Sequence, residues 1–153
     1  MEATVSSEHG ALKSLKDGLE LEPLDAVFLH EKTQKLFKYA RAKDKHEELK
    51  KDLLNIAGKQ QRRELCQKED ERHNTALHYA AKAGNLETCQ FLVEQGADIK
   101  ALGQNKMSPL QFAARYGDEK EGKEVWKCIK WIMEEEDKSN SQKEKEIFFY
   151  YIS

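Results

Sequence analysis

The sequence predicts an all-α protein built from short helical hairpins that stack side by side. The first reason is that the chain repeats itself at a spacing of 33 residues: Thr75, Leu77, Ala80, Ala81 and Gly84 recur as Ser108, Leu110, Ala113, Ala114 and Gly117. The second reason is that each copy contains apolar residues at helical spacing, with a glycine after each predicted helix. A hairpin this short cannot bury its apolar face alone, so we expect it to stack on its neighbours.

The first helix of each unit has a chemically marked beginning and end. Thr75 and Ser108 can each accept from backbone N–H groups that the first helical turn leaves unpaired. Pro109 follows Ser108 at the first helical position, where a missing N–H costs little. Gly84 and Gly117 follow the helices, and we expect both to adopt a left-handed conformation there.

The second helix of each unit returns antiparallel to the first, with an apolar face. The apolar residues of the two copies are now 40 positions apart: Cys89, Phe91, Leu92 and Val93 recur as Ile129, Trp131, Ile132 and Met133. The second copy therefore contains a seven-residue insertion between its helices, which we place around the segment EKEGKEV. Gly96 is predicted to end the second helix of the first copy.

The segment DERHNTALHYAAKAGNLETCQFLVEQGADIKA resembles the ankyrin repeat. Eleven residues match that family's pattern in one register: Asp70, Thr75, Leu77, His78, Ala80, Ala81, Gly84, Leu92, Gly96, Ala97 and Asp98. The resemblance implies a solenoid of helix-turn-helix units with hairpin loops. It also implies that His78 bridges to the backbone of an adjacent repeat, with Gln111 as its counterpart in the second unit. His73 and Lys106 replace the family's hairpin glycine, so we expect strained or remodelled turns there.

Five segments are predicted along the chain. A disordered or weakly helical tail covers 1–22, a degenerate N-terminal capping unit 23–66, and an ankyrin repeat 67–102. A second repeat with the inter-helix insertion covers 103–136, and a charged tail, disordered or truncated, covers 137–153.

Within the capping unit, we expect one helix from Pro23 to His30, with Val27 and Phe28 covering the end of the stack. Two further helices should lie between Thr33 and Cys66. The missing cap after the second repeat suggests a fragment of a longer repeat protein.

Composition narrows the classes of function. Lys and Arg total 26 against 28 for Asp and Glu, and a net charge of -2 provides no long-range attraction for nucleic acid. The N-terminus has neither the basic start nor the apolar run of a secretory signal, and no apolar run is long enough to span a bilayer. We therefore expect a cytosolic protein, or one on the cytosolic side of a membrane if it is part of a channel.

No constellation of residues points to catalysis, a cofactor or a metal. His73 and His78 lack a third ligand nearby, so a turn residue and a structural histidine are favoured over a metal site. Cys89 and Cys128 lie at apolar helix positions, whereas Cys66 has a more polar setting and is the better candidate for a reactive thiol. Three widely spaced cysteines favour free thiols over disulfides. Trp126 and Trp131 are expected to pack in the last helix. One of them would remain exposed if no further repeat follows.

The remaining hypothesis is binding of a protein partner. By resemblance, partners would contact the hairpin tips and the end of each first helix on the concave side. The corresponding residues are Glu71, Arg72, Asn74, Lys82, Gln104, Asn105, Met107, Arg115 and Tyr116. Arginine and tyrosine are common interface hot spots, although solvent-facing variable residues would give the same pattern. We expect a non-enzymatic protein-protein interaction module. The alternative is an N-terminal fragment of a transient receptor potential ankyrin-type cation channel, whose arrays also begin with a charge-rich helix pair.

Overall fold

The computed structural model describes the backbone of residues 26–152 and the side chains of residues 26–140. All regular elements in this part of the chain are helical, which confirms the all-α prediction. The α-helices are α2 (Ala26–Arg41), α3 (His46–Leu54), α4 (Lys59–Cys66), α5 (Ala76–Ala83), α6 (Leu86–Glu94), α7 (Pro109–Tyr116) and α8 (Gly122–Ile152), with short 3-10 turns η1 (Gln104–Lys106) and η2 (Glu119–Glu121). The tail predicted for residues 1–22 lies outside the described residues.

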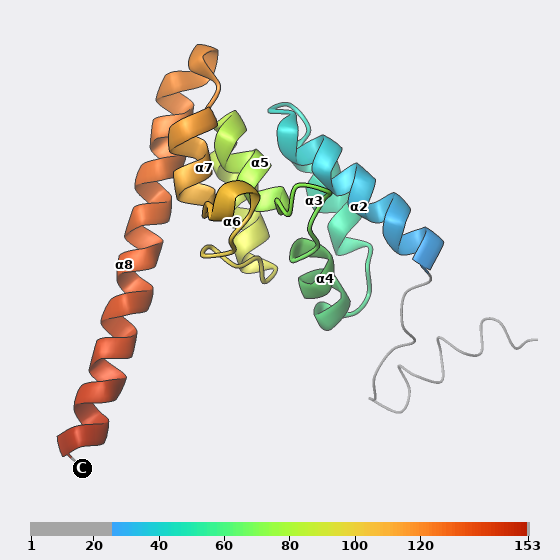
Figure 1. Cartoon of the computed structure of the whole chain (residues 1–153). Helices are drawn as coiled ribbons and strands as arrows, with labels where there is room; N and C mark the ends of the chain where they lie inside the picture. The colour runs from blue at the N-terminus through green and yellow to red at the C-terminus, as the bar shows by residue number, and fades with distance from the viewer. Residues whose placement is uncertain (1–25, 153) are drawn as a thin grey trace, which may run out of the picture.

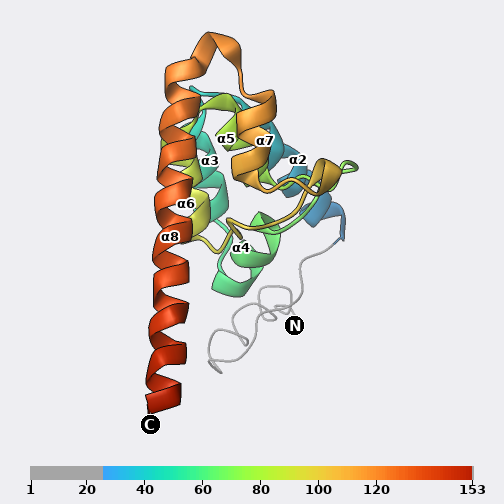
Figure 2. The same cartoon turned by 60° about the vertical axis from the view of Figure 1, so that its left-hand side comes forward.

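The helices form three hairpins that stack in two layers. The first helices of the hairpins, α2, α5 and α7, pack against one another, while the second helices, α3, α6 and α8, form the other layer. Helix α5 lies at the centre and contacts α2, α6, α7 and α8, as Figures 1 and 2 show. Leu77, Leu92 and Ile132 are completely buried between the layers. The predicted stacking of hairpins is therefore confirmed.

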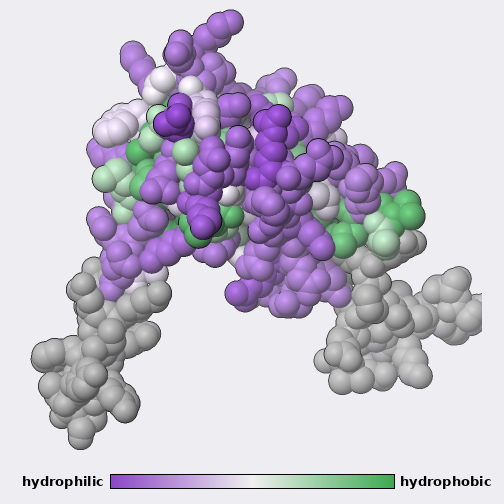
Figure 3. Space-filling view, in the orientation of Figure 1, coloured by the Kyte–Doolittle hydropathy of each residue, from purple (hydrophilic) through white to green (hydrophobic). Residues whose placement is uncertain are grey.

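The N-terminal unit differs from the prediction in its helices. A single helix, α2, replaces the two expected on either side of residue 31, because no glycine or proline interrupts residues 26–41. Val27 and Phe28 were expected to cover the stack, but their exposed fractions are 69% and 39%. Figure 3 shows hydrophobic surface near the start of α2, on a face that is otherwise largely hydrophilic. An additional helix, α4, follows α3 and carries buried Leu65 and Cys66.

Helix α8 is longer than the sequence predicted. It continues to Ile152, where a disordered or truncated tail was expected from residue 137, and Figure 1 shows it projecting past the other helices. After Gly122 the helix contains no glycine or proline, and its Glu, Lys and Gln residues are good helix formers. Ion pairs one turn apart support it, such as Lys138 Nζ to Glu135 Oε2 at 2.7 Å. The predicted insertion forms η2 and the first turn of α8.

The two predicted helix starts are confirmed, and one of the two predicted glycine turns is wrong. Thr75 precedes α5 and Ser108 precedes α7, and each residue forms a capping box with the residue three positions later. Gly84 has the expected left-handed conformation at φ 75°, whereas Gly117 has φ −55°. Only two residues separate α5 from α6, but five separate α7 from α8, so the second connection does not need to reverse as tightly. Gly117 is instead crowded, because a Cβ there would lie 2.5 Å from Ala113 O.

The hairpin turns show the backbone strain that the sequence predicted. His73 has φ 67°, and Lys106 has φ 58° with Asn105 beside it at 56°. These left-handed conformations are unfavourable for residues with a Cβ, and the ankyrin pattern places glycine at the His73 and Lys106 positions. The turns are therefore strained and not remodelled away from the left-handed region.

Candidate functional site

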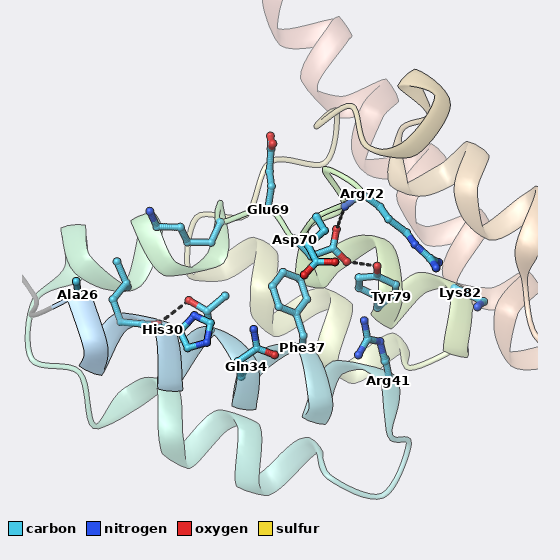
Figure 4. A pocket seen from close by; sticks show the side chains of 14 residues that line it. Ala26, His30, Gln34, Phe37, Arg41, Glu69, Asp70, Arg72, Tyr79 and Lys82 are labelled. Atoms are coloured by element: carbon cyan, nitrogen blue, oxygen red, sulfur yellow. Dashed lines mark hydrogen bonds between the residues drawn. The ribbon is translucent and has the colours of Figure 1, made fainter.

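A groove of about 810 Å³ lies between α2 and the loop that precedes α5. Figure 4 shows side chains from both walls directed into it. Helix α2 contributes His30, Gln34, Phe37 and Arg41, and the loop contributes residues 68–72. Tyr79 and Lys82 of α5 also line the groove. The groove thus lies between the N-terminal unit and the first recognisable repeat.

Asp70 organises the loop wall of the groove. Its Oδ1 accepts from the backbone N–H groups of Arg72 at 2.9 Å and Asn74 at 3.0 Å, which is the short-range pattern that lets aspartate begin a turn. Its Oδ2 accepts a hydrogen bond from the Tyr79 hydroxyl. The carboxylate therefore fixes both the loop and the aromatic side chain beside it.

Tyr79 forms an aromatic floor that continues across three helices. Its ring packs edge-on against Phe37 of α2 at a centroid distance of 5.7 Å and against Phe112 of α7 at 5.9 Å. The Arg41 guanidinium lies over the same ring, 4.2 Å from its centroid, within the range of a cation–π interaction. Phe37, Tyr79 and Phe112 are buried, so the floor is rigid while the Arg41 side chain stays exposed.

Asn74 and His78 tie the first loop to the second one. Asn74 Oδ1 accepts from Gln104 N at 2.9 Å, and its Nδ2 donates to the Tyr79 hydroxyl at 3.3 Å. His78 Nδ1 accepts from Thr75 N at 3.1 Å, so the ring is protonated on Nε2, which donates to Met107 O at 2.9 Å. This contact confirms that His78 bridges to the next repeat. Burial lowers the pKa of His78, because a charged ring is poorly solvated there.

Gly103 lets the second loop approach this close. A Cβ on Gly103 would overlap Asn74 Oδ1 and would lie 2.8 Å from His78 Nε2. The second loop therefore has glycine where the first has Asp70, 33 positions earlier. Gln111, the counterpart of His78, is exposed, and its Oε1 accepts from Ser108 N at 3.0 Å. That bond lies within its own repeat, unlike the bridge of His78.

The structure separates the nine predicted binding residues into three groups. Glu71, Arg72 and Lys82 line the groove. Asn74 is fully buried and hydrogen-bonded, so its prediction as a partner contact is wrong. Outside the groove lining are the five residues from the second repeat, of which Asn105 and Arg115 are exposed and the others half-buried: Gln104, Asn105, Met107, Arg115 and Tyr116.

The sequence did not predict that α2 forms a wall of the groove, or that Tyr79 forms its floor. His30, Gln34 and Arg41 belong to the degenerate unit, which lacks the hairpin residues needed to transfer positions from the first repeat. The available signal was the match of Phe37 and Tyr39 with Leu77 and Tyr79, which makes α2 a first helix. Helix α2 packs against α5 as another first helix, so the residues of α2 could have been included.

The cysteines and histidines do not form a reactive site in the described part of the chain. Cys66, Cys89 and Cys128 are free and buried, in agreement with the expected free thiols. Burial raises the pKa of Cys66 to about 12, so its selection as the better reactive thiol is wrong. Residues 26–140 contain no group of three or more His, Cys, Asp or Glu side chains arranged to hold a metal ion. Trp131 packs against the core, whereas Trp126 is 61% exposed.

Stacked helical hairpins whose first helices pack side by side define this chain as a repeat solenoid. The family described as ankyrin repeats (3 copies) matches residues 36–143, which is more than half of the chain. The chain belongs to the ankyrin repeat family. The match begins within α2, so it includes most of the degenerate unit. Ankyrin repeats generally mediate protein-protein interactions and are typically not enzymes.

A curated relative shares part of the repeat region. An ankyrin repeat protein of fowlpox virus (strain NVSL), FPV022, is 44% identical over 41 residues. The aligned segment covers 27% of this chain and 7% of the viral protein, so the match concerns little more than one repeat. Among the helices of the described residues, none is long and apolar enough to cross a membrane.

Proposed function

We propose that this chain is a protein-binding module that holds a segment of its partner in the groove between α2 and the loop preceding α5. The observation that carries the proposal is the groove itself, with a volume of about 810 Å³ and walls from two adjacent units. Its size falls within the range typical of ligand-binding clefts. Its floor is fixed by buried aromatic rings, and its rim carries exposed polar side chains from both walls.

This arrangement suits a peptide-like ligand. Gln34, Arg72 and Lys82 offer hydrogen-bond donors at the rim, while the buried rings of Phe37 and Tyr79 form the floor below them. Because the Asp70 network already fixes the loop, little loop entropy would be lost on binding. The groove is therefore organised before a partner arrives.

The ankyrin match supports a binding module. It does not distinguish the repeat array of a channel from the repeat array of any other ankyrin protein. We therefore propose binding alone, and the location in the cytosol remains part of the same proposal. A transcript that encodes apolar spans after Ser153 would bring the channel alternative forward.

A bulky substitution in the groove tests the proposed function. Gln34 is exposed on α2 and its side chain points into the groove (Figure 4), so Gln34→Trp should obstruct a bound segment without disturbing the core. Partners are first recovered by proximity crosslinking, and the affinity of each purified partner is then measured for both proteins. We expect the affinity to fall about tenfold or more, as for a hot-spot change, while circular dichroism is unchanged.

A matched control and a second measurement make the outcome decisive. Lys50→Trp places the same side chain at an exposed position of α3, away from the groove, and should leave affinity as in the wild type. Hydrogen exchange should show new protection in α2 and in residues 68–72 on binding. Equal affinity for the wild type and Gln34→Trp, with protection elsewhere, would disprove the groove as the binding site.

A further inference from the structure

Three cationic side chains meet at one end of the groove. Arg41 ends α2, Arg72 lies in the loop, and Lys82 lies in the last turn of α5. Figure 4 shows the Arg72 side chain extending toward Lys82, with the Arg41 guanidinium on the other side of Tyr79. We call Arg41, Arg72 and Lys82 the basic cluster. Arg115 of α7 stands 33 positions after Lys82, at the equivalent place in the next repeat; Arg115 is exposed, whereas Lys82 is half-buried.

The three side chains of the cluster have no direct ion-pair partner in the described part of the chain. Among the described residues, neither Arg41, Arg72 nor Lys82 forms an ion pair. Elsewhere on the surface several lysines are paired, for example Lys32 with Asp52 at 2.8 Å and Lys43 with Glu121 at 2.6 Å. Within residues 26–140, the cluster shares this lack of ion pairs with other exposed basic residues, such as Lys50 and Arg115, and differs from them in lining the groove.

The acidic residues of the groove are Glu69, Asp70 and Glu71, and two of them have partners already. Asp70 accepts from Tyr79 and from two backbone N–H groups. Glu69 Oε1 lies 3.1 Å from the His73 ring on the outside of the loop, and in Figure 4 its side chain points away from the cluster. Glu71 is exposed and lines the groove. The cluster therefore faces the groove with unpaired donors.

We propose that the groove selects a partner segment rich in Asp or Glu, whose carboxylates bind the basic cluster. This inference rests on the proposed function, and it adds the chemistry of the partner. An arginine guanidinium can donate two parallel hydrogen bonds to one carboxylate. Arg41 is held over the Tyr79 ring at 4.2 Å, so less side-chain entropy is lost when it binds. Lys82 supplies a third charge, toward which the Arg72 side chain extends (Figure 4).

A peptide fits these observations better than a nucleic acid. The chain has a net charge of -2, so no general positive field attracts a phosphate backbone. Glu71 lies next to Arg72 in the lining and would repel the evenly spaced phosphates of a strand passing along the groove. An acidic segment can instead place its carboxylates at the cluster and a neutral residue beside Glu71.

Selection from a library of random displayed peptides tests the chemistry directly. The full chain serves as bait in parallel with Arg41→Gln/Arg72→Gln/Lys82→Gln, and with Lys50→Gln as a control that removes an exposed charge from α3. We expect peptides selected by the wild type and by the control to be enriched in Asp and Glu, and those selected by the triple variant not to be. For one synthetic acidic peptide, each single substitution in the cluster should weaken affinity about tenfold, equivalent to about 1.4 kcal/mol.

Further measurements separate failure of this inference from failure of the proposed function. Neutral or basic peptides that bind the wild type and are blocked by Gln34→Trp would overturn the acidic-partner inference and leave the groove function standing. Peptides unaffected by Gln34→Trp would contradict the proposed function itself. A single-stranded RNA that binds the cluster more tightly than the acidic peptide would overturn the protein-partner inference. Affinity for the acidic peptide should fall with added salt, and a salt-independent affinity would also contradict it.

Discussion

His78 shows how one side chain can hold two repeats in register. Its Nδ1 accepts from the first residue of its own capping box, and its Nε2 donates to Met107 O in the next loop. Only the first bond requires the neutral ring, because a protonated Nδ1 could no longer accept from Thr75 N, whereas Nε2 can donate to Met107 O in either protonation state. The protonation state of His78 should therefore control the capping box at the start of α5, and through it the stability of the first repeat.

Acidification should destabilise the protein through His78. The folded state lowers the pKa of His78 below its ordinary value of 6.5, so the unfolded chain binds a proton more readily. This residue's stabilising contribution is complete above about pH 6.5 and is lost as pH falls through the folded pKa. Urea unfolding at a series of pH values measures the effect. The His78→Gln variant should be less stable at neutral pH by about 1 kcal/mol, and its stability should fall less below pH 6.5.

His30→Gln is the matched control for this measurement. His30 is exposed on α2 and has no role in the contact between loops, so its removal should preserve the acid-side decline. A His78→Gln variant that loses stability with acid as steeply as the wild type would show that other groups cause the decline.

At the scale of the helices, the close approach of α8 to the end of α5 depends on glycine. A Cβ on Gly84 would lie 2.8 Å from both Glu124 Cβ and Val125 N, and Gly84 also has φ 75°. By contrast, Gly122 has helical angles, and a Cβ there would meet nothing within 4 Å. The two glycines, both close to the start of α8, therefore have different functions in the fold.

Alanine substitution should distinguish these two glycines. Gly84→Ala should destabilise the fold by at least about 2 kcal/mol, because it combines left-handed strain with a clash against α8. Gly122→Ala should stabilise by up to about 1 kcal/mol, because alanine restricts the unfolded chain and favours helix. Thermal and urea unfolding of the two variants gives the comparison. A neutral Gly84→Ala would mean that α8 does not pack against the end of α5.

At the scale of the whole molecule, the stack is held through α5. Leu77 is completely buried on this central helix, which contacts a helix on either side. Its repeat counterpart Leu110 is only half-buried, because among the described residues α7 packs against another first helix, α5, on one side only. Equivalent positions in the two repeats should thus contribute unequally to the free energy of unfolding.

Truncation of these leucines should affect the molecule unequally. Leu77→Ala should cost about 2–5 kcal/mol, a large share of the total stability of a small domain. Leu110→Ala should cost less, because part of its side chain is already in water. Melting followed by circular dichroism, together with partner affinity, measures both. Binding by the Leu77→Ala protein should recover on cooling below its melting transition, since the groove residues are unchanged. An equal loss of stability for the two variants would contradict the central place of α5.

Much of the repeat architecture was predictable because it depends on local chemistry. The cap residues Thr75 and Ser108, the left-handed Gly84 and the strained His73 all act within a few residues of their own position. Such interactions recur wherever the pattern recurs, so one copy predicts the next. The stacking of the hairpins was predictable for a related reason, since an isolated pair has nowhere to bury its apolar face.

Tertiary structure alone decided which predicted residues can meet a partner. Asn74 matches a variable position of the repeat, yet contact with the second loop buries it and makes it a structural residue. Arg41 lies far from Tyr79 in sequence, and only the packing of α2 on α5 places its guanidinium over that ring. The groove forms between two units, so its surface depends on how helices from different parts of the chain pack. Periodicity within a repeat determines that the units stack, but burial and long-range contact determine the site.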